Sequence, residues 1–116
     1  MTIKRLAPEE RLSGASICGN IVYLAGQVAD DATLDVEGQT ADILKQIDAL
    51  LAEAGTSKSN ILSVQIFLTD INDIAAMNRA WDAWLDRGNK PARATVEAKL
   101  ANPDWKVEIT GVAFIP

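Results

Sequence analysis

The residues best suited to chemistry lie in one stretch, Lys90–Thr110, which reads KPARATVEAKLANPDWKVEIT. Side chains alternate along an extended strand, so Arg93, Thr95 and Glu97 share one face of the first half. Glu108 is the matching carboxylate of the second half. An arginine in this setting can bind a carboxylate through two parallel hydrogen bonds. The alternative interpretation is a solvent-exposed strand face with an Arg–Glu ion pair, which contributes little to stability.

The same stretch must also position these side chains. Residues 94–99 and 106–110 alternate in polarity and are joined by a segment containing Asn102, Pro103 and Asp104. This pattern predicts an antiparallel hairpin. One side of that hairpin would be apolar, and the other would carry the guanidinium, the hydroxyl and the carboxylates.

The N-terminal third predicts three further strands. We expect one strand over residues 2–6 and a hairpin over residues 16–28, turned at Gly19-Asn20. Gly26 follows the apolar run 21–25 directly. A glycine inside a strand marks either a bulge or a close approach of the backbone to a ligand, and the sequence favours neither.

Two amphipathic helices and one more strand complete the pattern. The first helix is expected over residues 36–54, with Asp35 as its N-cap and Gly55 as its stop. Residues 61–68 predict a strand whose even positions, beginning with Leu62, form an apolar face. The second helix is expected over residues 72–87 and ends at Gly88.

These elements predict a single α+β domain over residues 1–116. Two helices can cover only one face of a mixed sheet. The uncovered face would then carry Gln65, Phe67, Thr95 and Glu108, a mixture that predicts contact with other copies of the chain. Solvent exposure of that face is the alternative.

Composition narrows the function classes. The chain of 116 residues is 48% hydrophobic and 23% charged, with a net charge of −5, which argues against binding nucleic acid. No apolar run approaches a membrane span, and residues 1–10 lack the apolar core of a signal peptide. With Cys18 as the only cysteine, a cytoplasmic protein without an internal disulfide is expected.

Histidine is absent, which removes Ser–His and Cys–His nucleophiles and histidine metal ligands. If the protein is an enzyme, we expect it to work without a metal or cofactor. It would use arginine, glutamate, threonine, backbone groups and water.

The chain resembles the RidA/YjgF family over nearly its whole length. The resemblance is carried by short pieces in matching order: residues 22–27 (VYLAGQ), 39–40 (QT), Gly55, 67–70 (FLTD), 77–78 (MN), 91–93 (PAR), 96–97 (VE) and 107–109 (VEI). It implies a chorismate-mutase-like fold and a homotrimer whose sheets surround a central barrel, with three clefts between subunits. It also implies hydrolysis of reactive enamines and imines, such as 2-aminoacrylate, to 2-keto acids and ammonia.

The resemblance assigns roles to four residues. The carboxylate-binding arginine of the family falls on Arg93, and the glutamate that holds the attacking water falls on Glu108. The cleft-lining glycine falls on Gly26, and a helix asparagine falls on Asn78.

Three positions depart from the pattern of the family. Ala25 stands in place of the usual serine, Thr95 in place of the usual cysteine, and Leu12 near the usual aromatic residue. Thr95 keeps a group that can hydrogen-bond the substrate or the leaving nitrogen. These changes affect the lining of the cleft, and hence substrate preference.

Two other functions stay open from the sequence. A trimer that binds small carboxylates or 2-keto acids without hydrolysing imines would also need Arg93. Nuclease activity is the third choice, because the acidic charge and the lack of a base-stacking face count against it.

Overall fold

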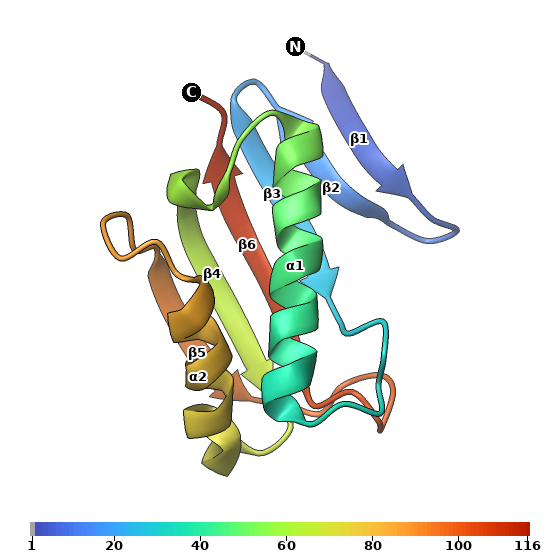
Figure 1. Ribbon diagram of the computed structural model, residues 1–116. Coiled ribbons are helices and arrows are strands. Elements are labelled where there is room, and N and C mark those ends of the chain that lie inside the picture. The colour runs from blue at the N-terminus through green and yellow to red at the C-terminus, as the bar shows by residue number, and fades with distance from the viewer. Residues whose placement is uncertain (1) are drawn as a thin grey trace.

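The computed structural model describes residues 2–116. It shows a six-stranded mixed sheet with two helices on one face (Figure 1). The strand order is β1-β2-β3-β6-β4-β5. The elements are β1 (Ile3–Pro8), β2 (Ser13–Cys18), β3 (Ile21–Gln27), α1 (Val36–Ala54), β4 (Ile61–Leu68), α2 (Ile74–Trp84), β5 (Ala92–Glu97) and β6 (Val107–Phe114). The predicted α+β architecture with both helices on one face is confirmed.

Helix α1 has the bounds that its capping residues predict. The Asp35 side chain accepts a hydrogen bond from the Gly38 N–H, 2.8 Å away, as an N-cap does. Gly55 takes φ 90°, and the next N–H, of Thr56, donates to the Leu51 carbonyl. This left-handed stop needs glycine because a Cβ would be strained there. Local signals at each end therefore fix this helix.

Helix α2 is shorter than predicted. A 3₁₀ turn, Ile71–Asp73, precedes it, and the helix ends at Trp84 instead of residue 87. Leu85 has already left the helical conformation, with ψ 135°. The Trp84 carbonyl accepts a hydrogen bond from the Lys58 ammonium, which satisfies one of the free acceptors at the end of the helix.

The predicted antiparallel hairpin of residues 94–110 is wrong. β5 pairs in parallel with β4, and β6 pairs antiparallel with β4 and with β3, so β4 lies between the two expected partners. The segment β4–α2–β5 is a parallel crossover unit, in which a helix connects two neighbouring parallel strands. This arrangement decides which face of the sheet each candidate side chain occupies.

The core lies between the sheet and the helices. Its largest fully buried side chains include Ile43, Leu44, Leu51, Ile66, Met77 and Ile109. On β4, Val64, Ile66 and Leu68 are buried as predicted. Leu62 is not, because a register shift between Ile61 and Ser63 turns it outward, and 49% of its surface is exposed.

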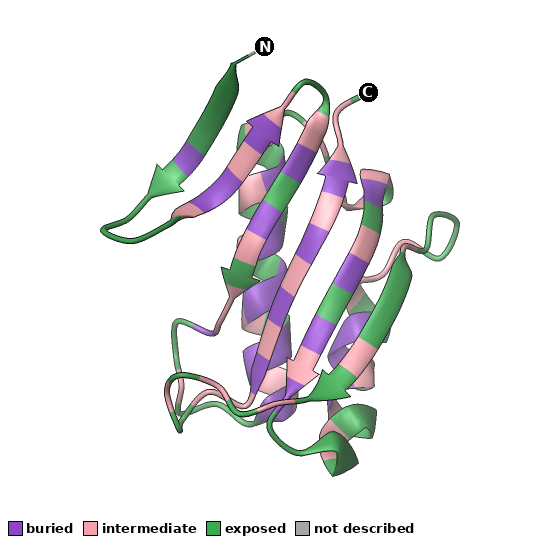
Figure 2. Cartoon of the chain, turned by 180° about the vertical axis from the view of Figure 1, so that it is seen from behind, coloured by how far each residue is buried: buried purple, intermediate pink, exposed green. Residues whose placement is uncertain are grey.

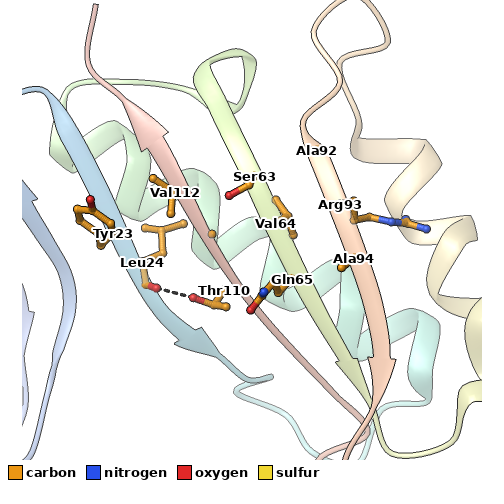
Figure 3. Close-up of a pocket in the computed structure, with 11 residues that line it drawn as sticks. Tyr23, Leu24, Ser63, Val64, Gln65, Ala92, Arg93, Ala94, Thr110 and Val112 are labelled. Carbon is orange, nitrogen blue, oxygen red and sulfur yellow. Dashed lines mark hydrogen bonds between the residues drawn. The ribbon is translucent and has the colours of Figure 1, made fainter.

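The opposite face of the sheet, called the open face here, is not covered by a helix (Figure 2). It mixes apolar and polar side chains, including Tyr23, Ser63, Gln65, Phe67, Val96, Glu108, Thr110 and Val112. A depression of 510 Å³ on this face is lined by Tyr23, Ser63, Gln65, Thr110 and Val112, among others (Figure 3). Tyr23 and Val96 are each about half exposed, at 53% and 47%. Isolated apolar residues on a surface are ordinary, but this face presents several of them together.

Within residues 2–116, neither helix is long and apolar enough to cross a membrane.

Candidate functional site

Arg93 lies on the helix-covered side of the sheet. Its register partner on β4 is Val64, which is buried beneath the helices, and neighbouring residues in a sheet point to the same face. The Arg93 side chain extends away from the depression on the open face and toward α2 (Figure 3). There, Nη1 donates a hydrogen bond of 2.9 Å to the Asn78 Oδ1. Two residues that the sequence assigned to one site are therefore in direct contact.

Trp81 is the third member of this group. The guanidinium carbon of Arg93 lies 5.2 Å from the centroid of a Trp81 ring, which is the geometry of a cation–π contact. This tryptophan was missing from the predicted site. It follows Asn78 by three residues on the same helix, so both side chains face the same way. That spacing was visible in the sequence. It could not predict a contact with Arg93, because the contact also requires β5 to lie beside α2.

Thr95 shares the face of Arg93, since it pairs with the buried Ile66. Its Oγ1 is buried and has no hydrogen-bond partner among the described residues. An unsatisfied buried hydroxyl costs about 1–3 kcal/mol. The oxygen is therefore closed to solvent in this structure.

Gly26 and Glu108 form a second group. β3 and β6 change register between Leu24 and Gln27, and Gly26 lies within this bulge. The Glu108 carboxylate rests against the glycine, because a Cβ built on Gly26 would lie 2.2 Å from the Glu108 Oε2. The glycine therefore serves both as a bulge residue and as the point of a close approach, and the approaching group is the carboxylate.

A hollow of 720 Å³ opens beside Gly26 and Glu108. Leu12 and Ala25, two positions where the chain departs from the family pattern, also line it. Trp105 lines it as well and was missing from the predicted site. Its place three residues before Glu108 was the only sequence signal for it.

The two groups occupy opposite faces of the sheet. The arginine group is Arg93, Asn78, Trp81 and Thr95, and the carboxylate group is Gly26 and Glu108. Glu108 pairs with Phe67 on β4, three residues from the partner of Arg93, so the two side chains leave the sheet in opposite directions. The prediction that Arg93, Thr95 and Glu108 share one uncovered face is wrong, because it depended on the incorrect hairpin.

The chain is similar to known proteins in both sequence and structure. Residues 2–115 match the family described as endoribonuclease L-PSP. A RutC family protein of Haemophilus influenzae is 53% identical over 97% of this chain and 98% of its own length. The RutC family protein YoaB of Escherichia coli is 50% identical over 99% of this chain and 100% of its own.

Solved structures of similar proteins support the same family. The crystal structure of NMB1025 from Neisseria meningitidis, a member of the YjgF protein family, superposes with a TM-score of 0.96 at 42% identity. That match covers 100% of this chain and 97% of the other. On these grounds the chain belongs to the endoribonuclease L-PSP family, the family of the RutC and YjgF/RidA proteins.

Proposed function

We propose that the protein hydrolyses reactive imines and enamines of 2-keto acids, such as 2-aminoacrylate, to 2-keto acids and ammonia. The observation that carries the proposal is that Arg93 is held in place, exposed to solvent and not paired with a carboxylate. Its guanidinium is held by Asn78 and lies against Trp81, yet the residue is exposed to solvent. No acidic side chain among residues 2–116 forms a salt bridge with it. The ordinary Arg–Glu pair of the alternative interpretation is therefore absent from the described chain.

The reaction needs positioning more than a strong nucleophile. An enamine first takes a proton on its terminal carbon and becomes the imine. Water then adds to the carbon of the C=N bond while a proton goes to nitrogen, and the resulting carbinolamine collapses to the ketone and ammonia. Arg93 would hold the carboxylate of the substrate through a two-point contact. Glu108 would orient the water and accept its proton.

The Arg93 guanidinium and the Glu108 carboxylate must both reach the same substrate molecule. Within a single chain they lie too far apart to do so. β4 lies between β5 and β6, so their backbones are roughly 10 Å apart, and their side chains point to opposite faces. We therefore propose a homotrimer in which each cleft takes Arg93 from one protomer and Glu108 from its neighbour. The helix-free open face, with exposed Tyr23 and Val96, supports such an interface.

The first test separates binding from turnover. Affinity for pyruvate is measured by calorimetry, and ammonia release is measured with imines freshly generated by an amino-acid oxidase. Arg93→Ala should abolish both, and Arg93→Lys should recover little because an ammonium cannot make the planar contact. Glu108→Gln should lower turnover by roughly 10²–10⁴ while affinity changes little.

The outcomes of this test also decide between the proposed functions. Pyruvate binding without hydrolysis of any imine would favour the binding protein over the enzyme. Full hydrolysis by Arg93→Ala would remove Arg93 from the site.

The second test asks whether the site is shared between protomers. Arg93→Ala and Glu108→Gln chains are mixed in equal amounts, unfolded and refolded together. Half of the chains supply an intact arginine and half an intact glutamate, so about a quarter of the clefts in random trimers would hold both. Turnover should recover to about that fraction of the wild-type value. If both residues act within one chain, the mixture stays as inactive as its components.

A further inference from the structure

The indole of Trp81 is itself held in place. Its ring lies 5.5 Å from that of Trp84, at an angle of 50°, and only 5% of the surface of Trp81 is exposed. The Trp84 Nε1 donates a hydrogen bond of 2.9 Å to the Asp48 Oδ2 on α1. The Lys58 ammonium lies 5.2 Å from the centroid of the Trp84 ring. The surface on which Arg93 rests is therefore built from two packed helices and not from a mobile loop.

This arrangement limits the freedom of Arg93 before any ligand arrives. An arginine side chain carries about 2 kcal/mol of rotamer entropy, which binding would otherwise have to remove. The cation–π contact with Trp81 and the hydrogen bond from Nη1 to Asn78 hold the guanidinium from two directions, which limits the positions it can take. The other N–H groups of Arg93 have no partner among the described residues, so they are free for the two oxygens of a carboxylate.

We propose that Trp81 is a positioning residue for substrate recognition, which holds the Arg93 guanidinium in the orientation that binds a carboxylate. The inference rests on the proposed function, since it assumes that Arg93 binds the carboxylate of a 2-imino or 2-keto acid. It adds that carboxylate binding by Arg93 also requires an aromatic ring at position 81. Asn78 alone fixes one nitrogen and leaves the plane of the guanidinium free to turn.

The test compares Trp81→Leu with the conservative Trp81→Phe. Pyruvate affinity, KM and kcat are measured separately, and thermal unfolding monitors the fold. Trp81→Leu should raise the Kd for pyruvate and the KM for the imine about twofold to thirtyfold, the range of a cation–π contact. Its kcat should change less than KM, because Glu108 is untouched. Trp81→Phe keeps an aromatic face and should restore most of the affinity.

A neutral ligand provides the matched control. Pyruvamide lacks the carboxylate, so its weak binding should be the same in wild type and in both variants. A purely structural role for Trp81 would weaken pyruvate and pyruvamide alike, and that result would overturn the inference. So would wild-type pyruvate affinity and KM in a folded Trp81→Leu protein.

A milder change covers the case in which Trp81→Leu does not fold. Tryptophan fluorinated on its six-membered ring keeps its shape but has a less negative face, so it should weaken pyruvate binding about twofold to fivefold. The same replacement in Trp81→Phe should have no effect, since the other tryptophans do not contact Arg93. Unchanged affinity in the fluorinated wild-type sequence would contradict the inference. Failure of the unmodified protein to bind pyruvate would instead contradict the proposed function.

Discussion

Replacing Gly26 by alanine should damage catalysis far more than stability. The added Cβ would lie 2.2 Å from Oε2 and 2.9 Å from Cδ of Glu108, where ordinary contacts begin at 3.4 Å. The carboxylate oxygen must therefore move by about 1.2 Å, the difference between these distances. The backbone can stay in place, because the displaced group is the end of a flexible side chain. The substitution thus moves the proposed water-holding group without removing it.

The expected magnitudes follow from that displacement. A misplacement of about 1 Å in a catalytic group costs roughly 10² in rate. Gly→Ala at a compatible backbone position gains about 0.4–1 kcal/mol through the unfolded state, which offsets the cost of moving the side chain. We therefore expect the free energy of unfolding to change by less than about 1 kcal/mol while turnover falls about a hundredfold.

Imine hydrolysis and denaturant unfolding are measured on the same preparations. Gly111→Ala is the matched control, because its Cβ would lie 2.9 Å from the backbone oxygen of Ser63, which cannot swing away. That variant should lose stability. The double variant Gly26→Ala/Glu108→Gln should be no slower than Glu108→Gln alone, since both changes act on one group. Wild-type turnover in a folded Gly26→Ala protein would refute the role given to Glu108.

Four further outcomes are expected. Asp35→Ala should lower the free energy of unfolding by about 1 kcal/mol through loss of the α1 cap, while Asp35→Asn should not, as denaturant titration at fixed protein concentration can check. Thr95→Val should raise the free energy of unfolding by about 1 kcal/mol, because it removes an unsatisfied hydroxyl. It should lower turnover if that hydroxyl hydrogen-bonds the substrate. A less stable variant would mean that the hydroxyl has a hydrogen-bond partner. Sedimentation at micromolar concentration should give about three times 12.5 kDa, and a monomer would contradict the shared site. Turnover should survive a chelator, and its loss would contradict the metal-free reaction.

The sequence was sufficient wherever structure depends on neighbouring residues. Asp35 and Gly55 define the ends of α1 through bonds to residues within the same few turns. The turn at Gly19-Asn20 is equally local, and Gly19 takes the positive φ of 61° that such a turn uses. For these elements the residue types alone determine the backbone.

Strand pairing is a different matter, because partner choice depends on the whole chain. Alternating polarity marked β5 and β6 as strands but could not show that β4 lies between them. The error carried over to the site, since Arg93 and Glu108 were placed on one face. For the same reason Trp81 was not predicted to belong to the site. Its contact with Arg93 exists only because β5 pairs with β4, which places Arg93 next to α2.

The strand order has a consequence for solubility. β1 and β5 each have one edge that pairs with no other strand within residues 2–116. Free N–H and C=O groups along such an edge can recruit another extended chain and begin aggregation. β1 carries Lys4 and Arg5 and ends at Pro8, which lacks an N–H, and Ala7 leaves the extended conformation at φ 46°. Its edge is therefore charged, interrupted and poorly suited to pairing.

β5 has fewer such features. Pro91 precedes it, and Arg93 and Glu97 are its only charged side chains. We therefore expect the arginine that we assign to substrate recognition also to oppose association of this exposed edge strand with others. Loss of the charge in Arg93→Ala should make concentrated solutions of that variant prone to self-association, whereas Arg93→Lys, equally impaired in binding, should stay dispersed.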